Sequence, residues 1–266
     1  MHLNSNLDHI RLNGEKLETY PNSLWTNKKL QWLDLGNNRL THFADEIFDL
    51  SDLQQLYLHE NQITTVPSEI SNLGSLEILD LSYNRISALP ASLSTLKKLK
   101  YLYISHNQLS LQESEETFPS HLEYLNLANN FIGFLPDVFF DLQALVELRL
   151  YNNQLKELPG SIYSLASLKE LHLANNRFFA LTEALGRLEQ LTYLDLRNNR
   201  LHSLPVSIGN LANLFFLDLR GNQLKELPES MATLKQLKKL DLRWNPIKYL
   251  PSWLEQLKDN GCLIHL

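Results

Sequence analysis

The chain has 266 residues, a formal net charge of −6, an isoelectric point near 5.8 and 44% hydrophobic residues. The acidic balance argues against a surface that binds nucleic acid. The single cysteine, Cys262, excludes a disulfide within the chain. This lack of a disulfide, together with the absence of any Asn-x-Ser/Thr sequon, fits a reducing or bacterial setting.

The first residues, Met1 to Asn6, have neither the basic region nor the apolar run of a secretory signal. The apolar runs of the chain are far shorter than a membrane span. We therefore expect a cytoplasmic protein without a membrane partner. A secreted effector, whose signal was removed or is unconventional, is the alternative.

A leucine recurs at an unbroken spacing of 23 residues along almost the whole chain. It occupies position 1 of eleven units: Leu7, Leu30, Leu53, Leu76, Leu99, Leu122, Leu145, Leu168, Leu191, Leu214 and Leu237. Self-similarity at one short period makes a chain a stack of units, each of which buries its apolar side against its neighbours. We predict a single domain, residues 1–266, with eleven repeats over residues 7–259 and a short cap at each end.

Each unit begins with the pattern of a short strand. Positions 4 and 6 are apolar and alternate with positions 3, 5 and 7, as in Leu76-Glu77-Ile78-Leu79-Asp80-Leu81. Equal spacing without reversal predicts parallel strands. Position 9 is Asn in ten units and Glu15 in the first. A buried amide both donates and accepts, so this column is expected to bond the backbone of the bend after each strand.

The second half of each unit predicts a short helical turn. Pro follows position 14 in eight units and is expected in the first turn of a short helix or 3₁₀ segment. The fifth unit departs from this pattern. Its residues Glu113 to Glu116 predict an acidic bulge, which is either a tolerated irregularity or a second contact site. At the C-terminus, residues 262–266 are expected to form a truncated twelfth strand, with Cys262 buried or at its edge.

The repeat Leu-x-x-Leu-x-Leu-x-x-Asn-x-Leu-x-x-Leu-Pro-x-x-Ile-x-x-Leu resembles a leucine-rich repeat of the 23-residue bacterial or Ras-suppressor-like intracellular class. The resemblance implies an α/β fold, a right-handed solenoid shaped like a horseshoe. Its concave side would be a parallel sheet of eleven or twelve short strands, and its convex side short helical or 3₁₀ turns and loops. It also implies a non-catalytic module that binds proteins, with a small GTPase or another signalling protein as a candidate partner.

The sequence contains none of the common catalytic motifs: no Gly-rich phosphate loop, no nucleophile elbow, no His-Glu-x-x-His and no Cys-x-x-Cys. His59, His106 and His172 lie in different units, and strands two units apart are ~10 Å apart, too far for ready joint ligation. We therefore expect no enzyme activity, no cofactor and no metal site, in a chain that is a monomer.

Side chains at positions 3, 5, 7 and 8 are expected to form the concave surface. Tyrosines gather there in units 3 to 6, and such rings are typical of interface hot spots, although cross-strand packing alone would also explain them. In units 9 to 11 the pattern Leu-Asp-Leu-Arg predicts either a self-neutralising ladder of exposed ion pairs or a charged rim that steers a partner. The predicted partner-binding residues are Trp32, Tyr57, His59, Ile78, Asp80, Tyr83, Tyr101, Tyr103, His106, Tyr124, Arg149, Tyr151, Arg197, Arg220 and Arg243.

The predicted function is therefore a protein-interaction module or scaffold that binds a protein or peptide on its concave face. Two alternatives remain open. One is binding of a carbohydrate or small molecule on the tyrosines, which would need a pocket. The other is a bacterial effector or surface adhesion protein.

Overall fold

The computed structural model describes residues 8–111 and 118–266. The chain forms two compact units, residues 1–130 and residues 131–266, and each is described by itself. The acidic segment Glu113 to Glu116 and the first leucine, Leu7, lie outside the described residues. That 1–266 is a single domain stays a prediction.

Within each unit the strands are three residues long and pair in parallel in sequence order. The first unit holds β1 (His9–Arg11), β2 (Trp32–Asp34), β3 (Gln55–Tyr57), β4 (Ile78–Asp80), β5 (Tyr101–Tyr103) and β6 (Tyr124–Asn126). The second holds β7 (Glu147–Arg149), β8 (Glu170–His172), β9 (Tyr193–Asp195), β10 (Phe216–Asp218), β11 (Lys239–Asp241) and β12 (Leu263–His265). The predicted parallel strands are confirmed.

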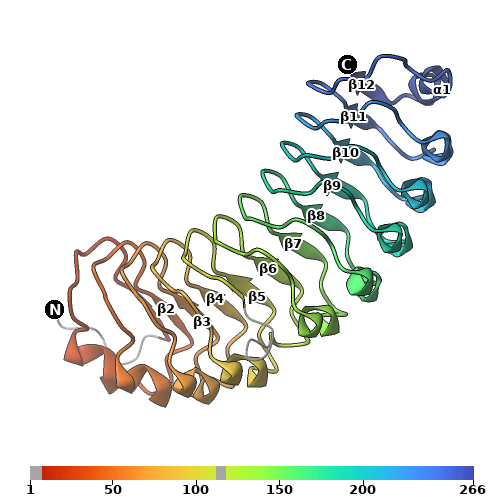
Figure 1. Ribbon diagram of the computed structural model, residues 1–266. Helices are drawn as coiled ribbons and strands as arrows, with labels where there is room; N and C mark the ends of the chain where they lie inside the picture. The colour runs from red at the N-terminus through yellow and green to blue at the C-terminus, as the bar shows by residue number, and fades with distance from the viewer. Residues whose placement is uncertain (1–7, 112–117) are drawn as a thin grey trace. The chain divides into compact units, whose positions relative to one another are not determined.

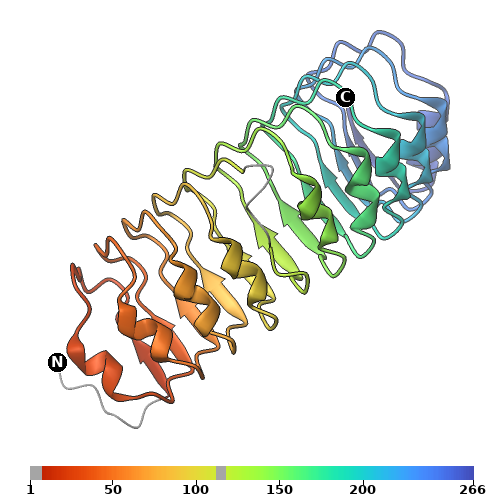
Figure 2. The ribbon, with the colours of Figure 1, turned by 60° about the horizontal axis from the view of Figure 1, so that its bottom comes forward.

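Short 3₁₀ turns lie on the side of each unit away from the strands (Figures 1 and 2). The first unit has η1 (Asn22–Thr26), η2 (Asp45–Asp49), η3 (Ser68–Asn72) and η4 (Ala91–Thr95). The second unit has η5 (Asp137–Asp141), η6 (Gly160–Ser164), η7 (Glu183–Arg187), η8 (Val206–Asn210) and η9 (Glu229–Thr233), followed by one α-helix, α1 (Trp253–Asp259). Each of these 3₁₀ turns is five residues long, so a repeat of 23 residues has room for it without a longer helix.

Proline stands one residue earlier than predicted. Pro67, for example, is the N-cap of η3 rather than part of its first turn, with φ −73° and ψ 158°. Its carbonyl accepts the bond from Ile70 N at 3.2 Å that closes the turn. Pro cannot donate a backbone hydrogen bond, so it suits a position whose carbonyl alone is used. Thr182 takes the same place before η7 and accepts from Ala184 N through its side chain.

The core consists of the apolar side chains at positions 1, 4, 6 and 11, which are fully buried in nearly every repeat. Most of them are leucines, and position 11 is Leu, Ile or Phe. The asparagine column at position 9 lies beside them and is also buried. Asn61 shows its role: its Nδ2 donates to the carbonyls of Leu35 and Leu58, and its Oδ1 accepts from Leu40 N at 2.9 Å. The predicted structural role of this column is confirmed.

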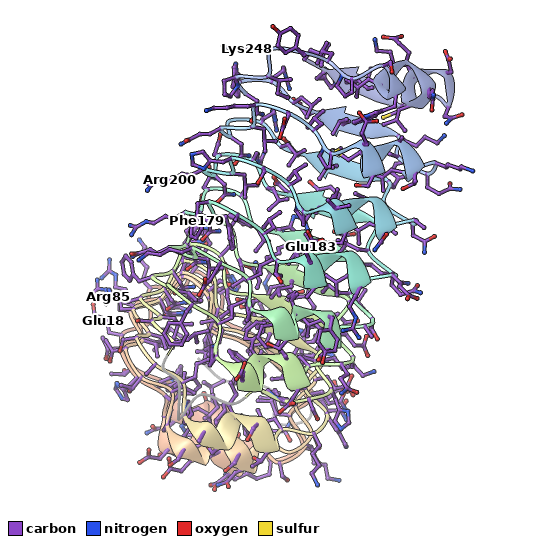
Figure 3. All side chains as sticks on the ribbon, turned by 45° about the vertical axis from the view of Figure 1, so that its right-hand side comes forward. Glu18, Arg85, Phe179, Glu183, Arg200 and Lys248 are labelled. Carbon is purple, nitrogen blue, oxygen red and sulfur yellow. The ribbon has the colours of Figure 1, made fainter. Side chains whose placement is uncertain are left out.

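Neighbouring turns in the second unit are tied together on the helical side. The carboxylate of Glu183 accepts hydrogen bonds from Val206 N and Ser207 N, the first two amides of η8, at 3.1 and 2.9 Å. In Figure 3, Glu183 lies with the helical turns, away from Phe179 and Arg200. These bonds lower the pKa of Glu183, since they favour its charged form.

The C-terminal prediction is confirmed. β12 adds to β11 with Lys239 opposite Leu263, and Cys262 is 5% exposed. Trp253 and Leu257 of α1 are buried and cover the apolar end of the stack. No helix among the described residues combines the length and the apolar character that a membrane crossing requires.

Candidate functional site

The face of the first unit's sheet that points away from the leucines carries a row of large side chains. We call it the aromatic surface and define it by Trp32, Tyr57, Ile78, Tyr101, Tyr103 and Tyr124. They come from strand positions 3 and 5, which share a face because side chains alternate along a strand. The register sets Ile78, Tyr101 and Tyr124 in one row.

Ring contacts hold the aromatic surface in place. Tyr103 lies 4.7 Å and Tyr101 6.5 Å from Tyr124 between ring centroids, and Trp32 lies 5.6 Å from Tyr57. Tyr101 is still 36% exposed, and the others are partly exposed. Rings that are packed at one edge and open at the other lose little entropy when a partner covers them.

Tyr83 and His106 lie at the edge of this surface, at position 8 of two successive repeats. Their rings stack at 3.9 Å with an interplanar angle of 12°, and Tyr83 is 50% exposed. Both have left-handed backbone, with φ of 57° and 54°. Burial lowers the pKa of His106, which keeps the imidazole neutral at pH 7.

The left-handed backbone at position 8 is a feature that the sequence analysis missed. It recurs throughout the described repeats, at Gly14, Asn37, Glu60, Tyr83, His106, Asn129, Asn152, Asn175, Asn198, Gly221 and Trp244. Asn and Gly adopt this conformation readily, whereas other side chains pay a steric cost. The frequent Asn and Gly in this column were the signal. An aromatic residue in this left-handed conformation strains the backbone, and such strained residues are found more often at functional sites.

Asp80 and His59 have structural roles beside the aromatic surface. Asp80 Oδ1 accepts from Ser82 N at 2.9 Å, and its other oxygen lies 3.7 Å from His59 Nδ1. The ring of His59 fills the space over Gly36, where a Cβ would come within 2.3 Å of it. Both side chains are about one quarter exposed or less, so they stabilise the aromatic surface and offer a partner little contact area.

The five other predicted site residues lie in the second unit, and the expectation of exposed ion pairs there is wrong. The aspartates at position 5 are buried: the side chains of Asp195, Asp218 and Asp241 are 1–4% exposed. Each accepts the backbone N–H two residues on, from Arg197, Arg220 and Arg243. The carboxylate is thus a backbone acceptor at the end of each strand, and its sequence signal was the recurrence of Asp or Asn at position 5.

The arginines lie over these carboxylates and are partly exposed. Arg220 binds Asp218 through two nitrogens and reaches Asp241 at 3.3 Å. Burial raises the pKa of Asp195. In Asp241 burial also acts to raise the pKa, but hydrogen bonds from Arg243 outweigh it and the pKa is lowered. The ladder is therefore self-compensating and leaves no row of free cations on this face among the described residues.

Arg149 and Tyr151 flank a second polar cluster. Arg149 Nε pairs with Glu147 Oε1, and His172 Nε2 lies 3.2 Å from Glu170 Oε2 and 3.8 Å from Glu147 Oε1. Tyr151 follows β7 and is partly exposed. Burial, and next the charge of Arg149, lower the pKa of His172 to about 4. The contact with Glu170 is therefore a hydrogen bond of a neutral imidazole at pH 7, whereas Glu147 lies beyond hydrogen-bond distance.

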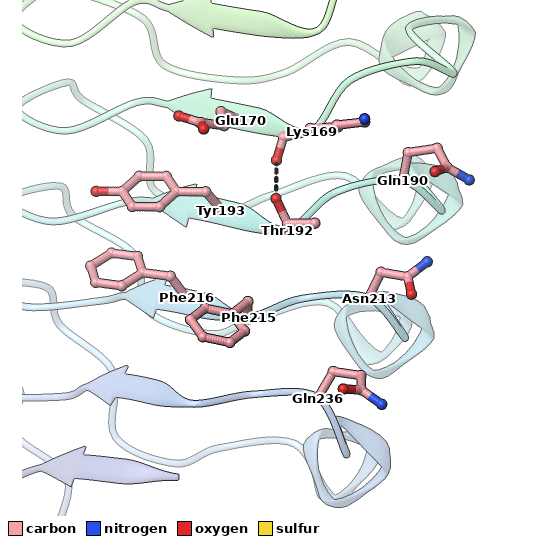
Figure 4. A pocket seen from close by; sticks show the side chains of 9 residues that line it. All are labelled: Lys169, Glu170, Gln190, Thr192, Tyr193, Asn213, Phe215, Phe216 and Gln236. Atoms are coloured by element: carbon pink, nitrogen blue, oxygen red, sulfur yellow. Dashed lines mark hydrogen bonds between the residues drawn. The ribbon is translucent and has the colours of Figure 1, made fainter.

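The second unit has an open hollow of about 620 Å³. Figure 4 shows the side chains that line it. Tyr193 and Phe216 form one side, with their rings parallel and 4.3 Å apart. Gln190, Asn213 and Gln236 precede successive strands and line the other side. The remaining lining residues are Lys169, Glu170, Thr192 and Phe215. None of the predicted tyrosines lines this hollow.

Stacked parallel strands, 3₁₀ turns and a buried asparagine column define a repeat protein that offers an extended side-chain surface. Sequence profiles identify its family. One described as "Leucine rich repeat" matches residues 28–86, 52–109 and 120–178, and one described as "Leucine-rich repeat region" matches residues 179–259. The chain belongs to the leucine-rich repeat family, as predicted. The 23-residue bacterial subclass stays a prediction.

A search among curated protein sequences finds no match. Solved structures are similar over most of the chain. A chain in the octameric complex of Latrophilin 3, Unc5D and the LRR part of FLRT2 has a TM-score of 0.80 at 25% identity, covering 95% of this chain and 84% of that one. The plant peptide hormone receptor RGFR1 in complex with RGF2 has a TM-score of 0.74 at 26% identity. That match covers 92% of this chain, which spans only 44% of the receptor.

Similarity at lower identity supports the fold alone. An internalin, inlF, from Listeria monocytogenes has a TM-score of 0.72 at 21% identity, covering 98% of this chain and 87% of that one. Together with the family profiles, these matches confirm the solenoid fold class. Leucine-rich repeat domains commonly serve as protein-interaction modules, and two of these similar structures are complexes with protein or peptide partners.

Proposed function

We propose that this chain is a non-catalytic binding module and that a protein or peptide partner contacts the aromatic surface of its first unit. The observation that carries the proposal is the row of partly exposed rings on β2 to β6. Large exposed apolar patches are rare on a surface with no partner. Tyrosine is also enriched among residues that dominate interface energies, because it offers large area with few rotatable bonds.

The stacked pair of Tyr83 and His106 supports the same site. Two neighbouring repeats have an aromatic ring at position 8, where the backbone is left-handed and the residue is usually Asn or Gly in this chain. One of these rings, that of Tyr83, is half exposed. Such backbone strain is retained where the side chain has a use. Cross-strand packing alone does not explain these two rings, because they lie after the strands rather than on them.

Binding of a carbohydrate on the tyrosines receives no specific support. The hollow in Figure 4 would be the place for a small ligand, but it belongs to the second unit and contains none of the predicted tyrosines.

Affinity capture with the full chain tests the proposal. The wild type, the double variant Tyr101→Ala/Tyr103→Ala and the control Glu69→Ala are immobilised and exposed to an extract of the native source. Glu69 is exposed on η3 of the same unit, away from the strands. Quantitative mass spectrometry should find a protein that the wild type and the control retain and the double variant loses. Equal recovery on all three would overturn the assignment of the surface.

A further inference from the structure

The strand face of the second unit brings together three side chains that commonly bind metals. Glu147 lies on β7 and Glu170 directly opposite on β8, as register partners. His172 follows Glu170 by two residues, so it projects from the same face. The ligand atoms of the three side chains lie within 4.8 Å of one another.

The two distances from His172 to the glutamate oxygens are close to those between ligands of a bound zinc ion. Tetrahedral zinc with bonds of about 2.1 Å places adjacent ligand atoms about 3.4 Å apart. His172 Nε2 is 3.2 Å from Glu170 Oε2 and 3.8 Å from Glu147 Oε1, on either side of that value. Glu170 has a side chain that is 44% exposed, so it has room for the remaining adjustment.

Glu147, Glu170 and Arg149 together leave one net negative charge at this place, although the charge of Arg149 opposes a positive charge on His172. Like charges directly opposite each other on neighbouring strands are destabilising, and Glu147 and Glu170 are such a pair. Arg149 compensates Glu147 and holds that carboxylate in place, as outer residues commonly do for metal ligands. The nearby Arg197 is paired with Asp195 at 3.3 Å. Among the described residues, Glu170 contacts the imidazole of His172, and no lysine or arginine lies within ion-pair distance of its carboxylate.

We propose that Glu147, Glu170 and His172 form a binding site for one divalent transition-metal ion of the zinc type. One imidazole nitrogen and two carboxylate oxygens are a ligand set that such ions accept, with water completing the coordination. The sequence had suggested no metal site, because only histidines two units apart were compared. The other two ligands are glutamates, Glu147 and Glu170, at position 3 of adjacent repeats.

Calorimetric titration of the full chain with zinc chloride tests the site, after treatment with a chelator and its removal. The wild type should bind one ion per chain. His172→Gln and Glu170→Gln should each weaken binding by about tenfold or more. His202→Gln is the matched control, because His202 is exposed in the same unit outside the cluster, and it should bind as the wild type does.

The fold of each variant is checked by circular dichroism. If His172→Gln fails to fold, the partly exposed Glu170→Gln decides the question. Absence of saturable binding in the wild type, or equal affinity in Glu170→Gln, would overturn the proposal. The outcome is independent of the proposed function, since the aromatic surface lies in the first unit.

Discussion

Replacing Asn84 by alanine should destabilise the chain strongly, although the change removes few atoms. Asn84 is 8% exposed. Its Nδ2 donates to the carbonyls of Leu58 and Leu81 at 2.9 and 3.0 Å, and its Oδ1 accepts from Ile63 N at 2.9 Å. The variant loses these three bonds and a fourth, from Nδ2 to the carbonyl of Ser82 at 3.3 Å.

The magnitude depends on which groups keep a partner. The carbonyl of Leu81 also accepts from Asn107 Nδ2 at 2.9 Å, so it remains bonded. Ile63 is fully buried, and the bond to Asn84 is the one that its amide makes in the structure. A buried amide without a partner costs about 1–3 kcal/mol, and the other lost bonds add about 1 kcal/mol. We expect a loss of about 2–4 kcal/mol.

Urea unfolding followed by circular dichroism measures this loss as a lower midpoint with an unchanged slope. Asn72→Ala is the control, because Asn72 is exposed at the end of η3, and it should change the free energy of unfolding by less than about 0.5 kcal/mol. Equal midpoints for the two variants would refute the contribution of the buried asparagine column to the free energy of unfolding.

Three further predictions concern the backbone, the packing of the turns and the C-terminal cap. Glu60→Asn should raise the free energy of unfolding by about 0.5–1 kcal/mol, and with it the melting temperature, because Asn tolerates the left-handed φ of 52° better. A lower melting temperature would contradict strain at position 8. Gly209→Ala should cost about 1–3 kcal/mol in urea unfolding, since its Cβ would lie 2.2 Å from Ser230 O, whereas Gly160→Ala meets nothing within 4 Å and should be neutral or stabilising; equal midpoints contradict this packing. Truncation after Lys248 removes α1 and β12 and should give aggregated material in size-exclusion chromatography with light scattering; a monomer that unfolds cooperatively would show that the cap is dispensable.

The repeat made most of the fold predictable. A fixed spacing forces each leucine of position 1 to meet the next, and the alternation after it specifies a strand of which one face is buried. The strands, the buried asparagines and the closing strand at Leu263–His265 follow from these two patterns. The position of proline was misplaced by one residue, because composition indicates that a turn begins nearby but not which residue caps it.

The placement of the tyrosines on one face of the sheet was predictable, but the surroundings of the polar side chains on that face were not. The tyrosines of β5 and β6 lie on one face, as the period of two requires. Whether a polar side chain on that face is exposed depends on the backbone after the strand, and this is where the prediction failed: Asp218 turns to the amide of Arg220 and is buried. The grouping of Glu147, Glu170 and His172 needed the register between two strands and the rotamers of three side chains, which a reading of single columns does not give.

Calorimetry with the partner recovered by affinity capture is the most direct test of the central claim, that the aromatic surface binds a protein or peptide. Tyr101→Ala should weaken binding by about 1–2 kcal/mol, or roughly five- to thirtyfold in Kd. Its melting temperature should change little, because the ring is 36% exposed and lies outside the leucine core. Glu69→Ala should bind as the wild type does. Unchanged affinity in Tyr101→Ala and in Tyr103→Ala would contradict the claim and leave the rings as sheet packing alone.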